Sequence, residues 1–368
     1  MQRGGRISKL VIVLLFCLPA TALADAGTPL MWAGAFHLVI GNALIGGLEG
    51  LLLAWMFRLN PWGCVAAMIP ANYFSAWCGD VFLLRYALKD PPNQDLYNAW
   101  QWVWMMVGVT FLLTCVLEWP FVFFCLRKSD HRLKKSIWGN LLVQAVSYVL
   151  LFGWYWAASG RSLYTRAHIV QPVAFPVPTN SVLYFISTNN NIYSMTLPDG
   201  TPQKISNVSY TNRQDRLFLR ESEPGKFNIF VRLDISPIAN DFQLVLSNLN
   251  AVATVPENEQ KEDLNHIPST WLSDGRVTTI GSATNSAWEF QTGFWPIGGL
   301  SGENHQTRER LDLAFETPFA AWNIRHGYQL PGDCVVFQLG EDQICILDPK
   351  TRRVALVARG HGPVVVLE

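Results

Sequence analysis

The chain has 368 residues, of which 50% are hydrophobic and only 15% are charged, and 28 Lys and Arg balance 28 Asp and Glu to a formal net charge of zero. The charged fraction lies well below the roughly 25% that is typical of soluble domains. No overall basic field favours nucleic acid as a partner. Because the apolar residues concentrate in the first 158 positions, we expect the lipid bilayer to be the main partner there.

The N-terminus has the three regions of a secretory signal in the usual order. Arg3, Arg6 and Lys9 precede an apolar stretch over residues 10–18, and the small-residue sequence Ala22-Leu23-Ala24 follows. This order predicts a signal peptide, residues 1–24, that is cleaved before Asp25. An uncleaved first membrane helix is the alternative, although the apolar stretch is shorter than the ~20 residues that span a bilayer. In both cases the chain that follows starts outside the cytoplasm.

Four long apolar runs come next, at residues 30–57, 62–88, 99–126 and 137–158. Each is long enough to cross a bilayer, so residues 25–158 are expected to form a bundle of four transmembrane helices. Five basic residues crowd between the third and fourth runs, at Arg127, Lys128, Arg132, Lys134 and Lys135. Cytoplasmic loops retain Lys and Arg, and this cluster therefore orients the bundle. We expect a multi-pass protein of the bacterial inner membrane, with its C-terminal half in the periplasm.

Each predicted span carries one polar side chain at a similar depth. Glu49 lies nine residues before Arg58, Glu118 nine before Arg127, Gln144 nine after Lys135 and Asn72 ten after Trp62. At 1.5 Å per residue, these positions lie roughly 13 Å from the inner boundary. Ionisable residues at this depth are costly and are expected to face the bundle interior with a partner. The four residues are the candidate binding site, as a cation or proton site; the alternative is that neutral carboxyl groups hold the bundle together by hydrogen bonds.

Two further features of the spans bear on this site. Gly46 and Gly50 flank Glu49 with the small-xxx-small spacing that lets two membrane helices approach closely, which predicts that the Glu49 face is the packed face. A second polar group, His37 on the first span and Asp80 on the second, is expected nearer the outer side.

The pattern changes after Ser159. Residues 159–180 contain several prolines and no long apolar run, and are expected to form a linker of extended character. From residue 181 to 368, short alternating segments separated by turn residues predict an all-β domain. The segments are residues 182–187, 191–197, 216–220, 227–233, 242–246, 334–339 and 344–347. The closing run at residues 363–367 is expected to pair with an N-terminal strand of this domain.

A weak internal repeat relates residues 182–205 to residues 334–356, since both consist of a strand, a polar turn, a strand, a turn with proline and another strand. The offset of 152 residues would fit four units near the ~40 residues of a propeller blade. The sequence around Asp348-Pro349-Lys350-Thr351 resembles the blade turns of bacterial β-propellers. The resemblance implies a propeller-like domain, with an irregular β-sandwich as the alternative.

Common catalytic and metal-binding motifs are absent from the sequence. It contains no Cys-x-x-Cys, His-Glu-x-x-His or Gly-x-Ser-x-Gly pattern, and the histidines of the β-rich half are scattered singly. We therefore expect no metal or cofactor. Cys334 and Cys345 flank a hairpin turn and are a candidate disulfide for an oxidising compartment, provided that the strand register points them to the same face.

Three functions are compatible with these patterns. The preferred hypothesis is an inner-membrane protein whose exported β-rich domain is a non-catalytic binding or scaffold module for an unknown extracytoplasmic protein or ligand. The first alternative is a transporter or ion-handling protein that uses Glu49 and Glu118. The second is an envelope enzyme that acts at the outer membrane–water surface, although no catalytic motif in the sequence supports it.

Overall fold

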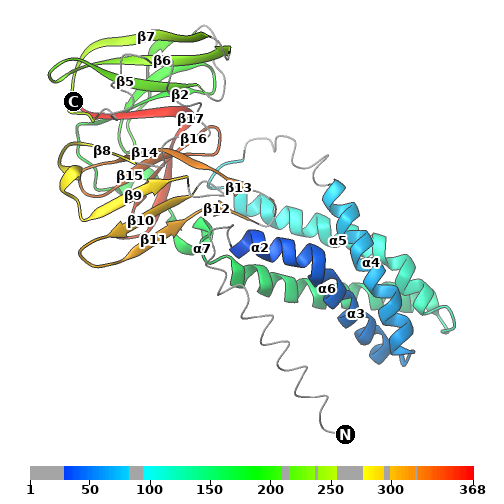
Figure 1. Cartoon of the computed structure of the whole chain (residues 1–368). Coiled ribbons are helices and arrows are strands. Elements are labelled where there is room, and N and C mark those ends of the chain that lie inside the picture. Colours follow the sequence, from blue (N-terminus) through cyan, green and yellow to red (C-terminus); the bar gives the residue numbers. More distant parts are fainter. Residues whose placement is uncertain are drawn as a thin grey trace. The chain divides into compact units, whose positions relative to one another are not determined.

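The computed structural model describes residues 29–82, 94–208, 215–236, 239–254, 277–293, 299–317, 319 and 321–368. The chain divides into two compact units. The first comprises Met1–Gly160 with Thr317–Ala320 and is helical, and the second comprises Arg161–Glu316 with Ala321–Glu368 and is rich in β-strands (Figure 1). The expected signal peptide lies outside the described residues.

The helical unit is built from consecutive helices that match the predicted apolar runs. They are α2 (Pro29–Phe36), the π-helical η1 (His37–Gly41), α3 (Asn42–Phe57), α4 (Pro61–Phe82), α5 (Ala99–Cys125) and α6 (Arg132–Ala158). Within the described ranges, three helices are long and apolar enough to cross a membrane, namely the continuous Pro29–Phe57, α5 and α6. The predicted bundle of four transmembrane helices is therefore not confirmed. The basic cluster covers the α5–α6 turn and the first turn of α6, as the sequence predicts.

The helices pack in sequence order, α3 against α4, α4 against α5 and α5 against α6, and α6 returns to α3. Their shared core is small and apolar, and consists of Leu53, Met68, Ala71, Val122, Leu126 and Val143. Large apolar side chains also point outward, among them Val149, which is 72% exposed. Apolar side chains on the outside of a helical unit are unfavourable in water and suited to lipid, which agrees with helices that are long and apolar enough to span a membrane.

The β-rich unit is organised around one large, curled, mixed sheet that resembles half of a barrel. Its order is β4 (Gln203–Asn207), β3 (Asn191–Thr196), β2 (Ser181–Ser187), β17 (Arg353–Leu367), β16 (Gln343–Asp348), β15 (Val335–Leu339), β14 (Ile324–Gln329) and β8 (Thr278–Thr279). The ninth strand, β1 (His168–Ile169), pairs in parallel with β17. The parallel pairs β1–β17 and β8–β14 make the sheet mixed.

Three smaller sheets complete the described strands. They are β5 (Arg216–Glu223) with β6 (Lys226–Ser236) and β7 (Ala239–Asn250), then β9 (Trp288–Thr292) with β10 (Leu300–Asn304) and β11 (Arg310–Leu313), and finally β12 (Phe315–Glu316) with β13 (Ala321–Trp322). The expected short strands are thus present, and the closing run pairs with β2 as predicted, from Val364 opposite Tyr184 to Leu367 opposite Ser181.

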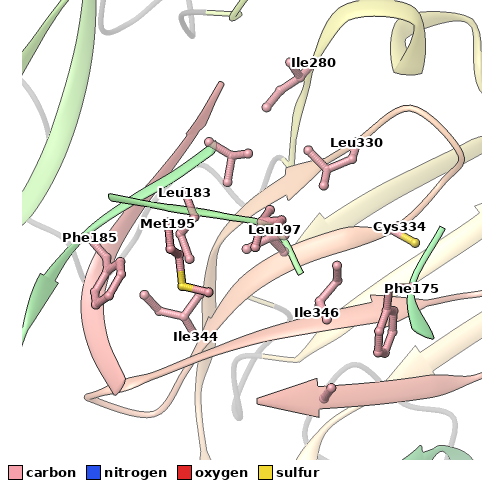
Figure 2. Packing of buried hydrophobic residues seen from close by; sticks show 13 residues of the cluster. Phe175, Leu183, Phe185, Met195, Leu197, Ile280, Leu330, Cys334, Ile344 and Ile346 are labelled. Atoms are coloured by element: carbon pink, nitrogen blue, oxygen red, sulfur yellow. The ribbon is translucent and has the colours of Figure 1, made fainter. Parts of the chain in front are cut away.

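The hydrophobic core of the large sheet explains why these strands form. Alternating residues of β2, β3, β15 and β16 point to one side and meet Phe175 and Ile280 from connecting segments (Figure 2). Leu183, Ile344 and Ile346 are fully buried there. Period-two alternation places one apolar face of each strand in this core, and the opposite faces of β15 and β16 are buried as well.

The expected propeller is not confirmed. Both copies of the predicted repeat, β2–β3–β4 and β15–β16–β17, belong to the same nine-stranded sheet, because β17 pairs with β16 on one side and with β2 on the other. Separate blades would require the two repeats to form sheets of their own. The predicted linker also differs: residues 161–180 contain α7 (Leu163–Arg166), β1 and the 3-10 helix η3 (Pro172–Ala174), and the β1–β17 pairing ties this segment to the sheet.

Candidate functional site

Glu49 lies on a face of α3 that small residues bring very close to α4. A Cβ atom on Gly46 would lie 2.7 Å from the Cα of Ile69, and one on Gly50 would lie 2.6 Å from the Cα of Val65. Only glycine allows two helix backbones to approach this far. Gly46, Glu49 and Gly50 are all buried, and the Glu49 side chain therefore enters the interior of the helical unit.

The structure brings the four predicted polar residues together. Asn72 Nδ2 donates to Glu49 Oε2 at 2.5 Å and lies 3.4 Å from Glu118 Oε2. Gln144 Nε2 donates to the same Glu118 oxygen at 2.6 Å. One side chain each from α3, α4, α5 and α6 therefore meets in one hydrogen-bonded layer, which we call the polar layer and which also includes two serines.

These two serines, Ser75 and Ser147, complete the layer and were missed by the sequence reasoning. Ser75 Oγ donates to Glu118 Oε1 at 2.5 Å, and Ser147 Oγ donates to Glu49 Oε1 at 2.6 Å. A signal for them exists in the sequence, because each serine follows a polar layer residue by three positions, Asn72 to Ser75 and Gln144 to Ser147. Residues three apart share a helix face.

Both carboxyl groups are withdrawn from solvent and fully engaged by uncharged donors. Glu49 is 1% exposed and Glu118 0%, and each of their four carboxylate oxygens accepts a hydrogen bond from Ser, Asn or Gln. Asn72 Nδ2 lies between the two carboxyl groups, 2.5 Å from Glu49 Oε2 and 3.4 Å from Glu118 Oε2. Among the described residues, neither forms an ion pair with Lys, Arg or His. The layer thus holds two acidic groups without a counter-charge.

The second predicted polar group does not join this layer. His37 lies in the π-helical segment, and its Nδ1 is 2.8 Å from the hydroxyl of Tyr155 on α6. The same segment leaves carbonyl groups for side chains, since Asn42 Nδ2 donates to Leu38 O and the hydroxyl of Tyr73 donates to Val39 O. π-Helical segments recur at functional sites. Asp80 belongs to α4, but its side chain lies outside what the structure describes.

Cys334 and Cys345 do not form the candidate disulfide. The β15–β16 register pairs Cys345 with Phe337 and Val335 with Leu347. Cys334 therefore lies three positions from the residue opposite Cys345, an odd number, so the two thiols point to opposite faces of the sheet. Cys334 packs in the core of the large sheet. The prediction failed on register, the feature on which it depended.

Metal chemistry receives no support from the part of the chain that the structure describes, where no group of three or more His, Cys, Asp or Glu side chains is placed to hold an ion. Comparisons with known proteins add no function: no family model, curated protein or solved structure matches the chain. The polar layer and the β-rich unit themselves are therefore the features that bear on function.

Proposed function

We propose that the protein is a proton-binding integral membrane protein and that the Glu49–Glu118 pair is its proton site. The observation that carries this proposal is the placement of two buried carboxyl groups on either side of one amide, Asn72 Nδ2, with no basic partner among the described residues. Two adjacent carboxylates cannot both be ionised cheaply in a medium of low polarity, because their repulsion and desolvation add. At least one of the pair therefore carries a proton.

The arrangement suits a proton better than a metal ion. Each carboxylate oxygen already accepts a hydrogen bond from a Ser, Asn or Gln donor, and these donors would have to turn away before an ion could coordinate. A proton shared between the two carboxyl groups needs no such rearrangement. Pairs of acids that titrate together in this way bind and release protons as a unit.

We further propose that α3, α4, α5 and α6 all cross the membrane, although α4 is not among the three helices that are long and apolar enough to do so. α4 packs between α3 and α5 and supplies Asn72 and Ser75 to the polar layer. If α3 and α5 cross the bilayer, α4 must traverse the same depth. The basic cluster at the α5–α6 turn supports an orientation in which that turn lies in the cytoplasm of a bacterial cell, and we propose the extracytoplasmic side for the β-rich unit.

The contacts of the polar layer favour the ion-handling alternative over the binding or scaffold module that was the preferred hypothesis from the sequence. Six polar side chains on four helices satisfy each other, and intramembrane acids are best treated as functional until shown otherwise. The β-rich unit keeps its proposed role as a binding module, and its motif-poor sequence continues to favour binding over catalysis.

The experiment uses the full-length protein in proteoliposomes that enclose a pH-sensitive dye. A potassium diffusion potential drives protons inward, and the rate of internal acidification is compared with that of protein-free vesicles. We expect flux from the native protein, and loss of flux from Glu49→Gln and from Glu118→Gln. Glu289→Gln, at an exposed position of β9 in the β-rich unit, is the matched control and should retain flux.

A second measurement separates proton binding from transport. The infrared carbonyl stretch of a protonated carboxyl group should be present in the native protein and should disappear in the double variant Glu49→Gln/Glu118→Gln. If this band is unchanged in a double variant that elutes and melts like the native protein, the pair holds no proton and the proposal fails. Flux that persists in both folded single variants would refute the transport role and leave the carboxyl groups as helix-packing residues.

A further inference from the structure

Two β-bulges in the β-rich unit each place a His-Gly dipeptide at the bulge. The β14–β15 register shifts between Arg325 and Tyr328, where His326 has a φ of 52°. The β17–β2 register shifts between His361 and Val364, where Gly362 has a φ of 58°. A non-glycine residue with positive φ is uncommon, and bulges that redirect a side chain are concentrated beside functional sites.

Direct contacts join the two bulges. Gln338 lies opposite Arg325 in the β14–β15 register, and its Oε1 accepts a hydrogen bond from the backbone N–H of Gly362 at 2.9 Å. Gly362 in turn lies against the first residue of β5, since a Cβ on this glycine would be 2.5 Å from the Cα of Arg216. Arg216 Nη1 is 3.4 Å from His326 Nδ1, and this contact leads back to the first bulge. We call Arg216, Arg325, His326 and His361 the basic cluster of the β-rich unit.

The contact between Arg216 and His326 defines the state of the histidine. A guanidinium group can only donate hydrogen bonds, and Nδ1 of His326 is therefore the acceptor. The ring is neutral, with its proton on Nε2. Burial, followed by the positive charges of Arg216, Arg325 and His361, holds the pKa of His326 well below its usual range. The positive charges of these three neighbours therefore favour the neutral ring.

Arg325 is also held in an unfavourable position for a cation. Burial lowers the pKa of its guanidinium, and the charge of Glu341 opposes this effect only in part. Its Nε is buried without a hydrogen-bond partner among the described residues. Burying a charged group without full compensation is costly. A negatively charged group bound at this cluster would offset its positive charge.

We propose that the basic cluster of the β-rich unit is a binding site for one oxyanion group, a phosphate or a carboxylate. Arg216 and Arg325 supply charge and planar N–H donors, the arrangement that guanidinium groups offer to both anions. The Nε2–H of His326 adds a neutral donor. Arg216, Arg325 and His326 are half-buried, whereas His361 is 6% exposed and forms the inner part of the site. This site is independent of the polar layer in the helical unit.

A purely structural role for the arginines makes a different prediction. The guanidinium of Arg216 lies 4.0 Å from the ring centroid of Phe218, a contact that stabilises the folded protein without any ligand. Under that role, replacing Arg216 or Arg325 destabilises the protein and leaves it indifferent to anions. Under the anion-site role, replacing the half-buried Arg325 relieves repulsion, and Arg325→Gln in ligand-free protein should melt at the same temperature as the native protein or higher.

The test measures anion binding to the full-length protein in detergent by isothermal titration and by the shift of the melting temperature. Inorganic phosphate and acetate are the two probes, each compared with chloride at equal ionic strength, and the arm that binds identifies the source chemistry. We expect one of them to bind and to raise the melting temperature. Arg216→Gln and Arg325→Gln should each weaken binding roughly tenfold or more, the loss expected for one charge-assisted hydrogen bond.

Arg220→Gln is the matched control, because Arg220 lies on β5 like Arg216, but opposite Asn228 and outside the cluster. This variant should bind the anion as the native protein does. Arg325→Lys keeps the charge but loses the planar donor pair, and an intermediate affinity is expected. If Arg216→Gln fails to fold, the Arg325 variants carry the test. No binding of either probe by the native protein, or equal binding by native protein and Arg325→Gln, would overturn the proposal.

Discussion

The close approach of α3 and α4 can be tested by adding single methyl groups. In Gly50→Ala the new Cβ would lie 2.6 Å from both the Cα and the N of Val65, and in Gly46→Ala it would lie 2.7 Å from the Cα of Ile69 and from Met68 O. Ordinary carbon contacts begin near 3.5 Å, and the two helices would therefore have to separate by about 1 Å at this point. The contacts are with backbone atoms, which no rotamer change can move.

This separation acts directly on the polar layer. Asn72, on α4, donates to Glu49, on α3, at 2.5 Å, and a displacement of about 1 Å stretches this hydrogen bond to the limit of bonding geometry. Overpacking costs typically 1–3 kcal/mol, and weakening a hydrogen bond to a buried acid adds about 1–3 kcal/mol. We therefore expect each substitution to lower the free energy of unfolding by about 2–6 kcal/mol.

Gly47→Ala is the matched control, because it lies on the same helix and its Cβ would meet nothing within 4 Å. Alanine is favoured over glycine in a helix interior by about 1 kcal/mol, so this variant should be neutral or more stable. The assay is reversible unfolding of the full-length protein in mixed micelles, followed by tryptophan fluorescence. If Gly46→Ala and Gly50→Ala prove as stable as Gly47→Ala, α3 and α4 do not approach as described and the reasoning is refuted.

Two further predictions concern the β-rich unit. Burial raises the pKa of the Cys334 thiol to about 12, and both Cys334 and Cys345 are fully buried. Neither cysteine should therefore react with iodoacetamide in the native protein, and both should react after denaturation without a reductant. A cross-linked Cys334–Cys345 peptide in a non-reducing digest would contradict this prediction. Burial alone would raise the pKa of Asp333, but hydrogen bonds from Ser286 and Lys350 outweigh it and hold the pKa below its usual value. The stabilisation from this depressed pKa is therefore present above the pKa of about 3.9 in the unfolded chain and is lost as the pH falls through the pKa in the folded protein. As the pH decreases, the melting temperature of the native protein should fall more steeply than that of Asp333→Asn. Parallel falls in melting temperature would contradict the depressed pKa of Asp333.

The polar layer shows what could be predicted from the sequence and what could not. The constant rise of a helix converts residue counts into depth, so Glu49, Asn72, Glu118 and Gln144 could be assigned to one level from their distances to the helix ends. Depth does not fix the direction in which a side chain points around its helix. That direction depends on which neighbour each helix packs against, and the Gly46–Gly50 pair was the only sequence signal for it. Ser75 and Ser147 were missed because serine is common in membrane helices and carries no charge.

Long-range strand pairing was the part that sequence patterns could not supply. Alternation located the strands, because it depends on neighbouring residues only. Register depends on turn geometry, and the turn between Leu339 and Gln343 places Cys334 and Cys345 on opposite faces. The repeat suggested separate blades, yet β17 is long enough to pair with both halves. The basic cluster of the β-rich unit was invisible for the same reason, since its histidines are scattered singly along the chain and meet only through the two bulges.

The position of β17 has a consequence for how the β-rich unit comes into being. This strand, Arg353–Leu367, follows all the other strands of the large sheet in the sequence, yet it lies between β2 and β16 and also pairs with β1. The two halves of the large sheet therefore keep open edges until residues 353–367 have been synthesised. Such edges are prone to pair with other chains, which makes this unit dependent on rapid release or on a chaperone that shields β2 and β16 until β17 arrives.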